Sequence, residues 1–262
     1  MKKVGILYIC TGEYSNFWDN FYQSCEKHFA SECERHYFIF TDNTKFLDLK
    51  INRVHPIFQE QMKWPYPTLF RYKIFNQYRE HFQDMDYLIF CNANLLFQDS
   101  ISLYDLFKER YMFAVLHPGY YDKSIDKFPD ETNQKSLAYI KRDNSSKYVC
   151  GGFNGGTLGK FLSMSKELSE NIDEDLSNNI IAIWHDETHF NKYVELNKNI
   201  INMLDSGYCF PENTIHRLKM KIIVLDKDNI ISIKHKGVLY ILKYFIIKKI
   251  KYFKNKIVGG KK

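Results

Sequence analysis

Residues 86–94 read Asp-Tyr-Leu-Ile-Phe-Cys-Asn-Ala-Asn, and this stretch decides the fold that the sequence predicts. After Asp86 the residues up to Cys91 are continuously apolar, without polar alternation, which indicates a strand buried on both faces. Strands of this kind belong to parallel sheets, whose ligands bind beyond the carboxyl ends of the strands. The turn Asn92-Ala93-Asn94 follows directly, so we expect it to face a ligand.

Two amphipathic stretches precede this strand. From Phe17 to Phe29 an apolar residue recurs every four positions, which predicts a helix within residues 16–33 that has Asn16 as its N-cap. A second helical stretch begins at Thr68, after the turn that the prolines of Trp-Pro-Tyr-Pro-Thr impose. We therefore expect two helices before the strand.

Two further strands frame the first of these helices. Residues 4–9 are apolar and β-rich, and residues 37–41 (YFIFT) repeat the pattern. The order strand, helix, strand, helix, strand predicts a single α/β domain built on a parallel, doubly wound sheet. Because parallel strands end at a common edge, the turn at residues 10–14 should lie beside the Asn-Ala-Asn turn.

The second half of the chain is less regular. A strand at 111–116 is followed by a polar, turn-rich segment, residues 122–146, which we expect to be a long loop. Residues 150–156 (CGGFNGG) hold four glycines, which indicates that the backbone approaches another group closely. An apolar strand is predicted at 180–184, and residues 185–187 (HDE) then open a helix.

Charge and cysteine content narrow the function classes. Residues 229–262 contain ten lysines and no acidic residue, whereas acidic residues outnumber basic ones in residues 1–228. We expect this basic amphipathic tail to lie on an anionic membrane surface, with a solvated tail as the alternative. Residues 1–228 are acidic on balance and offer no basic face that continues the tail, which argues against a protein that binds nucleic acid.

The six cysteines form no Cys-x-x-Cys pair, and the N-terminal apolar run is too short to span a bilayer. Together these two features favour a cytoplasmic protein with free thiols.

The Asn-Ala-Asn turn bears on metal binding. Amide oxygens are neutral, and hard divalent cations depend strongly on the charge of their ligands. Asn92 and Asn94 therefore predict weak metal binding or none. The alternative is that the two asparagines only cap the turn after a strand.

Residues 184–187 (WHDE) combine an indole with three titratable groups. An indole face stacks on a pyranose ring and an imidazole hydrogen-bonds hydroxyls, so Trp184 and His185 are typical of a sugar site. Asp186 and Glu187 are also ordinary residues at a helix N-terminus, where they complement the dipole. His185 and His189 are spaced i, i+4 as in zinc motifs, but Glu187 does not follow the first histidine directly.

Taken in order, these segments resemble glycosyltransferase family 6, the family of the histo-blood-group A and B transferases and the α-1,3-galactosyltransferases. The resemblance extends from about residue 4 to residue 228. The Asn-Ala-Asn variant is similar to bacterial members that work without metal. The matching stretches are YICTGEY, EKHF, IFTD, KWPYPTLFR, DYLIFCNAN, LHPGYY, CGGFNGG and IWHDETHFNKY.

The resemblance implies a GT-A-type, Rossmann-like domain over residues 1–228, with a mostly parallel central sheet flanked by helices. It implies a UDP-sugar donor, N-acetylgalactosamine or galactose as the transferred sugar, and retention of anomeric configuration. The implied acceptor is the 3-hydroxyl of a β-galactoside, commonly fucosylated, in lipopolysaccharide or surface-glycan synthesis. No metal cofactor is expected, and the implied location is the inner face of the bacterial inner membrane.

The resemblance also assigns roles to residues. Glu187 corresponds to the glutamate beneath the reacting carbon and is the expected catalytic group. Lys227 corresponds to a lysine on a mobile C-terminal segment that closes on the diphosphate, and Gly152 leaves room for an N-acetyl group. His117 and Trp184 correspond to acceptor contacts, together with Glu187. The remaining donor-binding positions are Ile9, Thr11, Tyr14, Arg71, Asn92, Asn94, Cys150, Gly151 and Asp186.

One segment departs from the family pattern. Residues 128–133 (FPDETN) stand where the family has Phe-Thr-Tyr-Glu-Arg-Arg, which leaves acceptor recognition open. The missing metal acids also leave a non-catalytic sugar-binding module as the alternative function. The retained Glu187 and Lys227 argue against that alternative.

Overall fold

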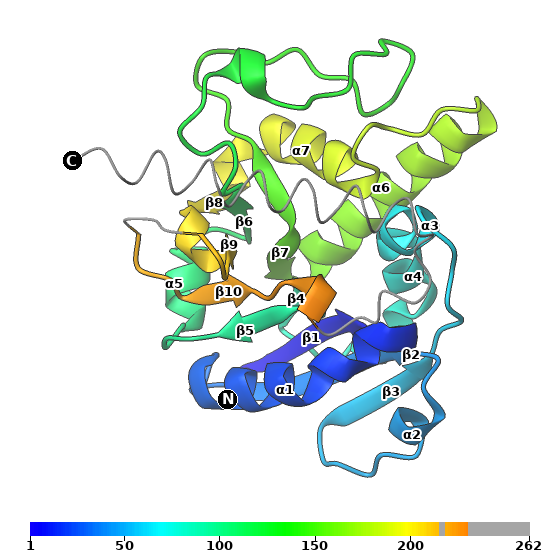
Figure 1. The fold of residues 1–262 in the computed structure, drawn as a ribbon, viewed down its shortest axis with the longest axis vertical. Helices are drawn as coiled ribbons and strands as arrows, with labels where there is room; N and C mark the ends of the chain where they lie inside the picture. The colour runs from blue at the N-terminus through cyan, green and yellow to red at the C-terminus, as the bar shows by residue number, and fades with distance from the viewer. Residues whose placement is uncertain (215–217, 230–262) are drawn as a thin grey trace. The chain divides into compact units, whose positions relative to one another are not determined.

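In the computed structural model, which describes residues 1–214 and 218–229, a seven-stranded sheet forms the centre of the first compact unit, Met1–Asp226 (Figure 1). The strands lie in the order β3-β2-β1-β4-β7-β6-β8. They are β1 (Lys3–Ile9), β2 (Glu34–Thr41), β3 (Val54–Phe58), β4 (Tyr87–Cys91), β6 (Met112–Leu116), β7 (Val149–Thr157) and β8 (Ile201–Leu204).

The sheet is mostly parallel, as the sequence predicts. Strand β1 pairs in parallel with β2 and β4, β2 pairs in parallel with β3, and β6 pairs in parallel with β8. Strand β7 is the exception, because it runs antiparallel to both β4 and β6. Its first residues, Val149 to Gly152, therefore lie at the same edge of the sheet as the carboxyl ends of β1 and β4.

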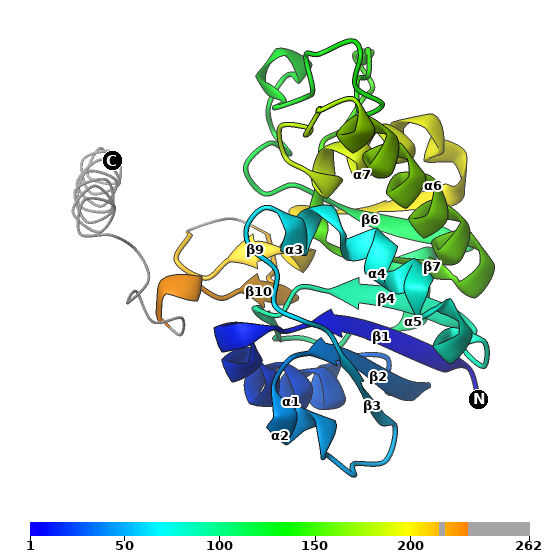
Figure 2. The same cartoon turned by 90° about the vertical axis from the view of Figure 1, so that its right-hand side faces the viewer.

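Helices cover both faces of this sheet, and α4, α6 and α7 group together away from α1 (Figures 1 and 2). Tyr8 faces α1, with its ring centroid 4.3 Å from that of Phe21. The neighbouring Leu7 belongs to the hydrophobic core on the other face of the sheet. In that core the ring centroids of Phe75 in α4 and Phe90 lie 5.6 Å apart. The helices are α1 (Trp18–His28), α2 (Thr44–Leu47), α3 (Tyr66–Leu69), α4 (Arg71–Gln77), α5 (Leu103–Phe107), α6 (Leu158–Ser177) and α7 (Asp186–Leu196).

The glycine-rich motif is part of strand β7. A Cβ atom added at Gly155 would lie 2.7 Å from Phe113 Cε1 and 2.8 Å from the carbonyl oxygen of Leu88. Neither distance leaves room for a methyl group, because the neighbouring strands carry bulky side chains on that face. The predicted close approach of the backbone to another group is therefore confirmed at Gly155.

A second sheet of three short strands follows the Asn-Ala-Asn turn. Strand β5 (Leu95–Phe97) pairs antiparallel with β10 (Ile222–Val224), which pairs in parallel with β9 (Phe210–Pro211). Since β5 begins one residue after Asn94, this sheet brings residues far apart in the sequence to the predicted ligand edge.

Three local predictions are wrong. The first helix is shorter than 16–33, because a 3-10 turn at Gly12–Phe17 precedes α1, and Phe17 rather than Asn16 is its N-cap. The helix expected from Thr68 is divided into α3, α4 and a 3-10 turn at Arg79–Phe82. Residues 180–184 form no strand, and Ile181, Ile183 and Trp184 are about half exposed. Their apolar character reflects a surface turn rather than a buried strand.

The second compact unit, Lys227–Lys262, is described only at the 3-10 turn Lys227–Asn229. The predicted amphipathic tail therefore lies outside the described residues, except for Asn229. Across residues 1–214 and 218–229, no helix combines the length and the apolar character that crossing a bilayer requires.

Candidate functional site

The glycine pair Gly151-Gly152 is the meeting point of the site. The N–H of Gly151 donates to Glu187 Oε2 at 2.7 Å, and its carbonyl oxygen accepts from Arg71 Nη1 at 3.0 Å. The carbonyl oxygen of Gly152 accepts from the N–H of Asn92 at 2.9 Å. A Cβ atom at position 152 would lie 2.9 Å from Asn92 Nδ2, so a side chain there would require the Asn92 side chain to move. The structure thus joins β4, β7, α4 and α7 at one point.

Arg71 and Asp186 form a buried ion pair beside these glycines. The guanidinium Nη1 lies 2.9 Å from Asp186 Oδ2, and both side chains are less than one-tenth exposed. The guanidinium also lies 4.2 Å above the ring of Phe90, a favourable cation–π arrangement. Burial raises the pKa of Asp186 to about 6, although the positive charge of Arg71 acts in the opposite direction.

Glu187 is held by neutral groups instead of a cation. Its Oε1 accepts from the hydroxyl of Tyr148 at 3.0 Å, and its Oε2 accepts from Gly151. Burial raises the pKa of Glu187 to about 7, while these two hydrogen bonds lower it and the nearby Asp186 raises it further. A carboxyl group that is fixed in place and titrates near neutral pH has the properties of a nucleophile or a charge stabiliser.

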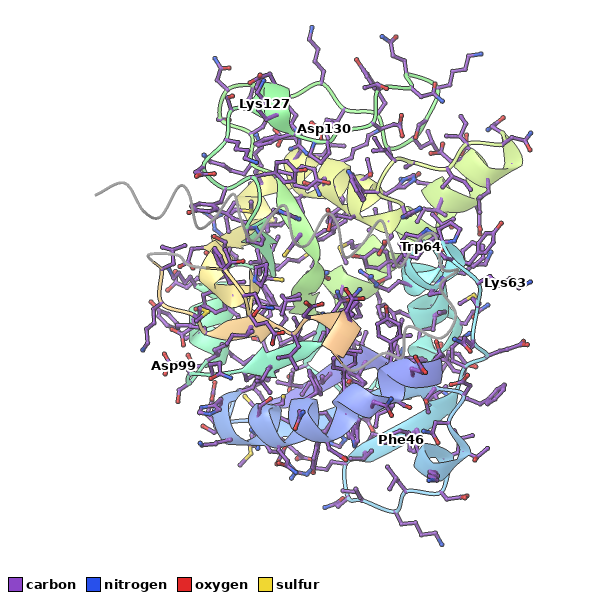
Figure 3. All side chains as sticks on the ribbon, viewed as in Figure 1. Phe46, Lys63, Trp64, Asp99, Lys127 and Asp130 are labelled. Atoms are coloured by element: carbon purple, nitrogen blue, oxygen red, sulfur yellow. The ribbon has the colours of Figure 1, made fainter. Side chains whose placement is uncertain are left out.

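Three polar side chains that the sequence pattern did not indicate, those of Asn191, Arg142 and Asp130, hold the helical turn that carries Glu187 against β7. Asn191 lies one helical turn after Glu187 and accepts from the N–H of Val149 at 2.9 Å. Its Nδ2 donates to the carbonyl oxygens of Val149 and Glu187 at 2.8 and 2.9 Å. Arg142 donates to the same amide and pairs with Asp130 at 2.6 Å. Asp130 is labelled on the loop before β7 in Figure 3.

The two asparagines of the turn after β4 have different surroundings. Asn92 lies against Gly152 at the ligand edge. Asn94 is 2% exposed, and its Nδ2 donates to the carbonyl oxygen of Leu225 at 2.7 Å. The N–H of Leu225 returns a bond to the carbonyl oxygen of Asn94 at 2.8 Å.

This set of ligands does not fit a divalent metal. The turn offers neutral amide oxygens only, and the Nδ2 group of Asn94 is engaged by Leu225. Within the described part of the chain, no three His, Cys, Asp or Glu side chains are grouped as metal ligands. The two histidines of the i, i+4 pair have different neighbours. His189 Nε2 lies 3.4 Å from Asp175 Oδ2, whereas the ring of His185 packs edge-on against Trp64, with ring centroids 4.9 Å apart. Trp64 is labelled in Figure 3.

The predicted donor-binding residues Ile9, Thr11 and Tyr14 belong to β1 and the turn that follows it, and β1 lies beside β4 and its amide turn. Ile9 ends β1, which pairs with β4 in the register Tyr8 to Cys91. Thr11 precedes the 3-10 turn that contains Tyr14, and the N–H of Gly12 in that turn donates to Asp42 Oδ1 at 2.7 Å. The hydroxyl of Tyr8 donates to the carbonyl oxygen of Ala93 at 3.0 Å and ties β1 to the amide turn.

The predicted acceptor residues adjoin Glu187: His117 packs against Tyr148, and the carbonyl oxygen of Trp184 accepts from the N–H of Glu187 at 3.1 Å. The ring of His117 lies 5.7 Å from that of Tyr148, and burial lowers the pKa of His117 to about 4. Its Nδ1 accepts from the N–H of Gly119 at 2.9 Å, so the neutral ring presents Nε2–H as a donor. Trp184 is 49% exposed, and the strained backbone of His185 (φ 55°) follows it directly. An exposed indole at this turn is suited to stacking on a sugar ring.

Cys150 and Lys227 are two further predicted site residues. Cys150 is buried, and a hydrogen bond with the thiol of Cys209, together with burial, raises its pKa. Its thiol is therefore neutral and unreactive. Lys227 belongs to the second compact unit, so its predicted contact with the diphosphate stays a prediction.

Comparisons with known proteins show which family the chain belongs to. The family model described as Glycosyltransferase family 6 matches residues 2–234. The chain is 34% identical over 225 residues to the O-antigen biosynthesis glycosyltransferase WbnI of Escherichia coli, an alignment that covers 86% of this chain and 95% of that protein. It is 30% identical to histo-blood group ABO system transferase 1 of Rattus norvegicus, covering 74% of this chain and 57% of the relative. It is 28% identical to globoside alpha-1,3-N-acetylgalactosaminyltransferase 1 of Gallus gallus, covering 72% and 57%. The chain thus spans somewhat more than half the length of these two vertebrate relatives.

Proposed function

Because this chain belongs to glycosyltransferase family 6 and is a glycosyltransferase, we propose that it transfers N-acetylgalactosamine or galactose from UDP to the 3-hydroxyl of a β-galactoside. The anomeric configuration of the sugar is retained. The observation that carries the proposal is the Glu187 carboxylate, fixed by Gly151 and Tyr148 beside a strand residue that has no side chain.

The donor lies along the ligand edge, from Ile9, Thr11 and Tyr14 to the glycine pair. The sugar sits over Gly151 and Gly152, where the side chain nearest the missing Cβ of Gly152 is that of Asn92, which can turn aside to leave space. This space favours N-acetylgalactosamine over galactose, since the N-acetyl group is the larger substituent. The name of the Gallus gallus relative, an alpha-1,3-N-acetylgalactosaminyltransferase, supports the same choice.

In the transfer step, the bond between C1 and the diphosphate oxygen breaks and UDP leaves with the electron pair. The Glu187 carboxylate stabilises the positive charge that develops at C1, through its own charge or through a transient ester. The acceptor 3-hydroxyl forms the new bond to C1, and its proton passes to the departing diphosphate. Asp186 holds the sugar, and Arg71 keeps Asp186 ionised.

Fixed donors take the place of a metal at the diphosphate. The neutral amide of Asn92 offers N–H groups, which can bind phosphate oxygens directly. Lys227 adds a positive charge from the C-terminal segment. We expect activity to survive EDTA and to gain little from Mn²⁺, because the turn holds no carboxylate.

The acceptor lies between His117, Trp184 and Glu187. Trp184 stacks on a sugar ring, and His117 donates from Nε2 to a hydroxyl. The names of the Escherichia coli and Rattus norvegicus relatives refer to O-antigen and histo-blood group, which supports a surface glycan as acceptor. The enzyme works in the cytoplasm, and its basic tail, residues 229–262, binds the anionic inner face of the membrane.

A panel of UDP-sugars against fucosylated and plain lactose, with EDTA or Mn²⁺, tests the proposal. We expect UDP-N-acetylgalactosamine and fucosyl-lactose to be the preferred pair, with equal rates in both buffers. A strict Mn²⁺ requirement would contradict the role given to the amides. Absence of both transfer and donor hydrolysis would instead favour a non-catalytic sugar-binding module.

A further inference from the structure

The carboxamide of Asn94 is directed at the protein's own backbone. It is 2% exposed, and Nδ2 lies 2.7 Å from the carbonyl oxygen of Leu225. The N–H of Leu225 donates back to the carbonyl oxygen of Asn94, and Leu95 then pairs with Val224 in the β5–β10 ladder. The amide thus extends a two-stranded ladder by one bond that a backbone alone could not supply.

From this geometry we infer that Asn94 is a positioning residue, whose amide N–H groups hold the end of β10 at the ligand edge. The chemistry of the bond explains why an amide is needed. The carbonyl oxygen of Leu225 accepts only, and an ionised aspartate has no hydrogen to donate. An aspartate at position 94 would therefore set a charged carboxylate oxygen against the partly negative carbonyl oxygen of Leu225 in a buried place, and Leu225 would have to move.

The hydrogen bond from Asn94 to Leu225, here called the brace, lies two residues before Lys227 in the sequence, and the proposed function requires Lys227. Asp226 follows Leu225, and its N–H donates to Glu212 Oε1 at 3.0 Å, so the strand end is fixed on both sides. Lys227 comes next in the sequence. This step rests on the proposed function: if Lys227 binds the diphosphate, Asn94 sets where its segment begins. The second asparagine of the turn is then a structural donor, and only Asn92 is left to face the diphosphate.

The chain offers a matched control. Asn202 of β8 makes the same type of bond, from Nδ2 to the carbonyl oxygen of Leu106 at 2.7 Å, on the edge strand of the large sheet. Asn94→Asp and Asn202→Asp make the same chemical change at two places. Asn94→Ala removes the donor without adding charge and serves where Asn94→Asp does not fold.

Hydrogen–deuterium exchange on the full chain, without substrate, tests the brace. We expect Asn94→Asp and Asn94→Ala to increase deuterium uptake in residues 222–226 by about tenfold in rate, while Asn202→Asp leaves that segment as in wild type. Unchanged uptake in both position-94 variants would overturn the inference. This readout does not depend on the donor, so it stands even if the proposed function fails.

Donor kinetics test the consequence of the brace. We expect Asn94→Ala to raise the KM for the UDP-sugar about tenfold with a smaller change in kcat, and Asn202→Asp to leave both near wild type. Adding Mn²⁺ should not restore Asn94→Asp. Restoration by Mn²⁺ would show that the side chain faces the diphosphate and would overturn the inference. Faster exchange with an unchanged KM would overturn the link to the donor while leaving the glycosyltransferase proposal intact.

Discussion

The amide turn after β4 and the acidic turn at the start of α7 both contact the Gly151-Gly152 pair, but their electrostatics are opposite. In the amide turn, neutral groups are bonded to backbone and no charge is buried. In the acidic turn, a buried carboxyl group, Asp186, is adjacent to a partly buried one, Glu187, and the cation Arg71 pairs with Asp186. The pKa values of both acids are raised as a result. The comparison supports our proposal that the chemistry takes place at the acidic turn, at the Glu187 carboxyl group, which has no cationic partner of its own.

Removing the charge of Glu187 should give the largest effect on activity. Glu187→Gln keeps the size of the side chain, and the Tyr148 hydroxyl can accept from the new amide. We expect kcat to fall by about three orders of magnitude or more, with donor Kd within about threefold of wild type. Steady-state assays and calorimetry with UDP-sugar would measure the two quantities. Turnover near wild type would mean that Glu187 is not at the reacting carbon.

Removing the cation should break the acidic turn itself. Arg71→Met leaves Asp186 buried without its partner, which costs about 3–5 kcal/mol of unfolding free energy. Arg79→Met is the matched control, since the Arg79–Glu80 pair is exposed and contributes at most about 1 kcal/mol. Urea denaturation of the two variants measures the difference. Equal losses would show that the buried pair has no special importance for the fold.

The raised pKa of Glu187 predicts a gain in stability when its charge is removed. Burial favours the protonated form in the folded chain, so the ionised form destabilises the fold increasingly as pH rises from about 4.5 to about 7. We expect Glu187→Gln to be more stable than wild type by about 1–3 kcal/mol at pH 8, with the gain close to zero at pH 4.5. Urea denaturation at both pH values checks this. A gain that does not change with pH would assign the effect to packing.

The smallest effect should come from the hydroxyl that orients Glu187. The hydrogen bond from Tyr148 lowers the pKa of Glu187, so Tyr148→Phe raises that pKa. The acid limb of the kcat profile should then move to higher pH by about one unit. Tyr193→Phe removes another buried hydroxyl, which bonds Met112 Sδ at 3.7 Å, and should leave the profile unmoved. If the kcat profile of Tyr148→Phe, like that of Tyr193→Phe, coincides with the wild-type profile, Tyr148 does not orient Glu187.

The same comparison shows what could be predicted from the sequence. The amide turn was found because it follows a continuous apolar strand of the predicted parallel sheet. The glycine pair was found because residues 150–156 hold four glycines, which indicates a close approach of the backbone to another group. The position of Asn191 one helical turn after Glu187 could be predicted from the sequence. Its hydrogen bonds to Val149 of β7 could not, because no sequence pattern indicates them. Tyr148 and Arg142 come from a loop without periodicity, so no pattern indicated their direction. The partner of Asn94, Leu225, is 131 residues away, and only the three-dimensional ladder of β5 and β10 reveals it.

The pH dependence of the single-turnover rate, with donor bound in advance, tests the central claim most directly. If the Glu187 carboxylate acts at the reacting carbon, the wild-type rate rises with pH through an apparent pKa near 7. The residual rate of Glu187→Gln should then be flat over the same range, because the titrating group is gone. A limb near pH 7 that persists in Glu187→Gln would contradict the claim and assign the chemistry to another residue.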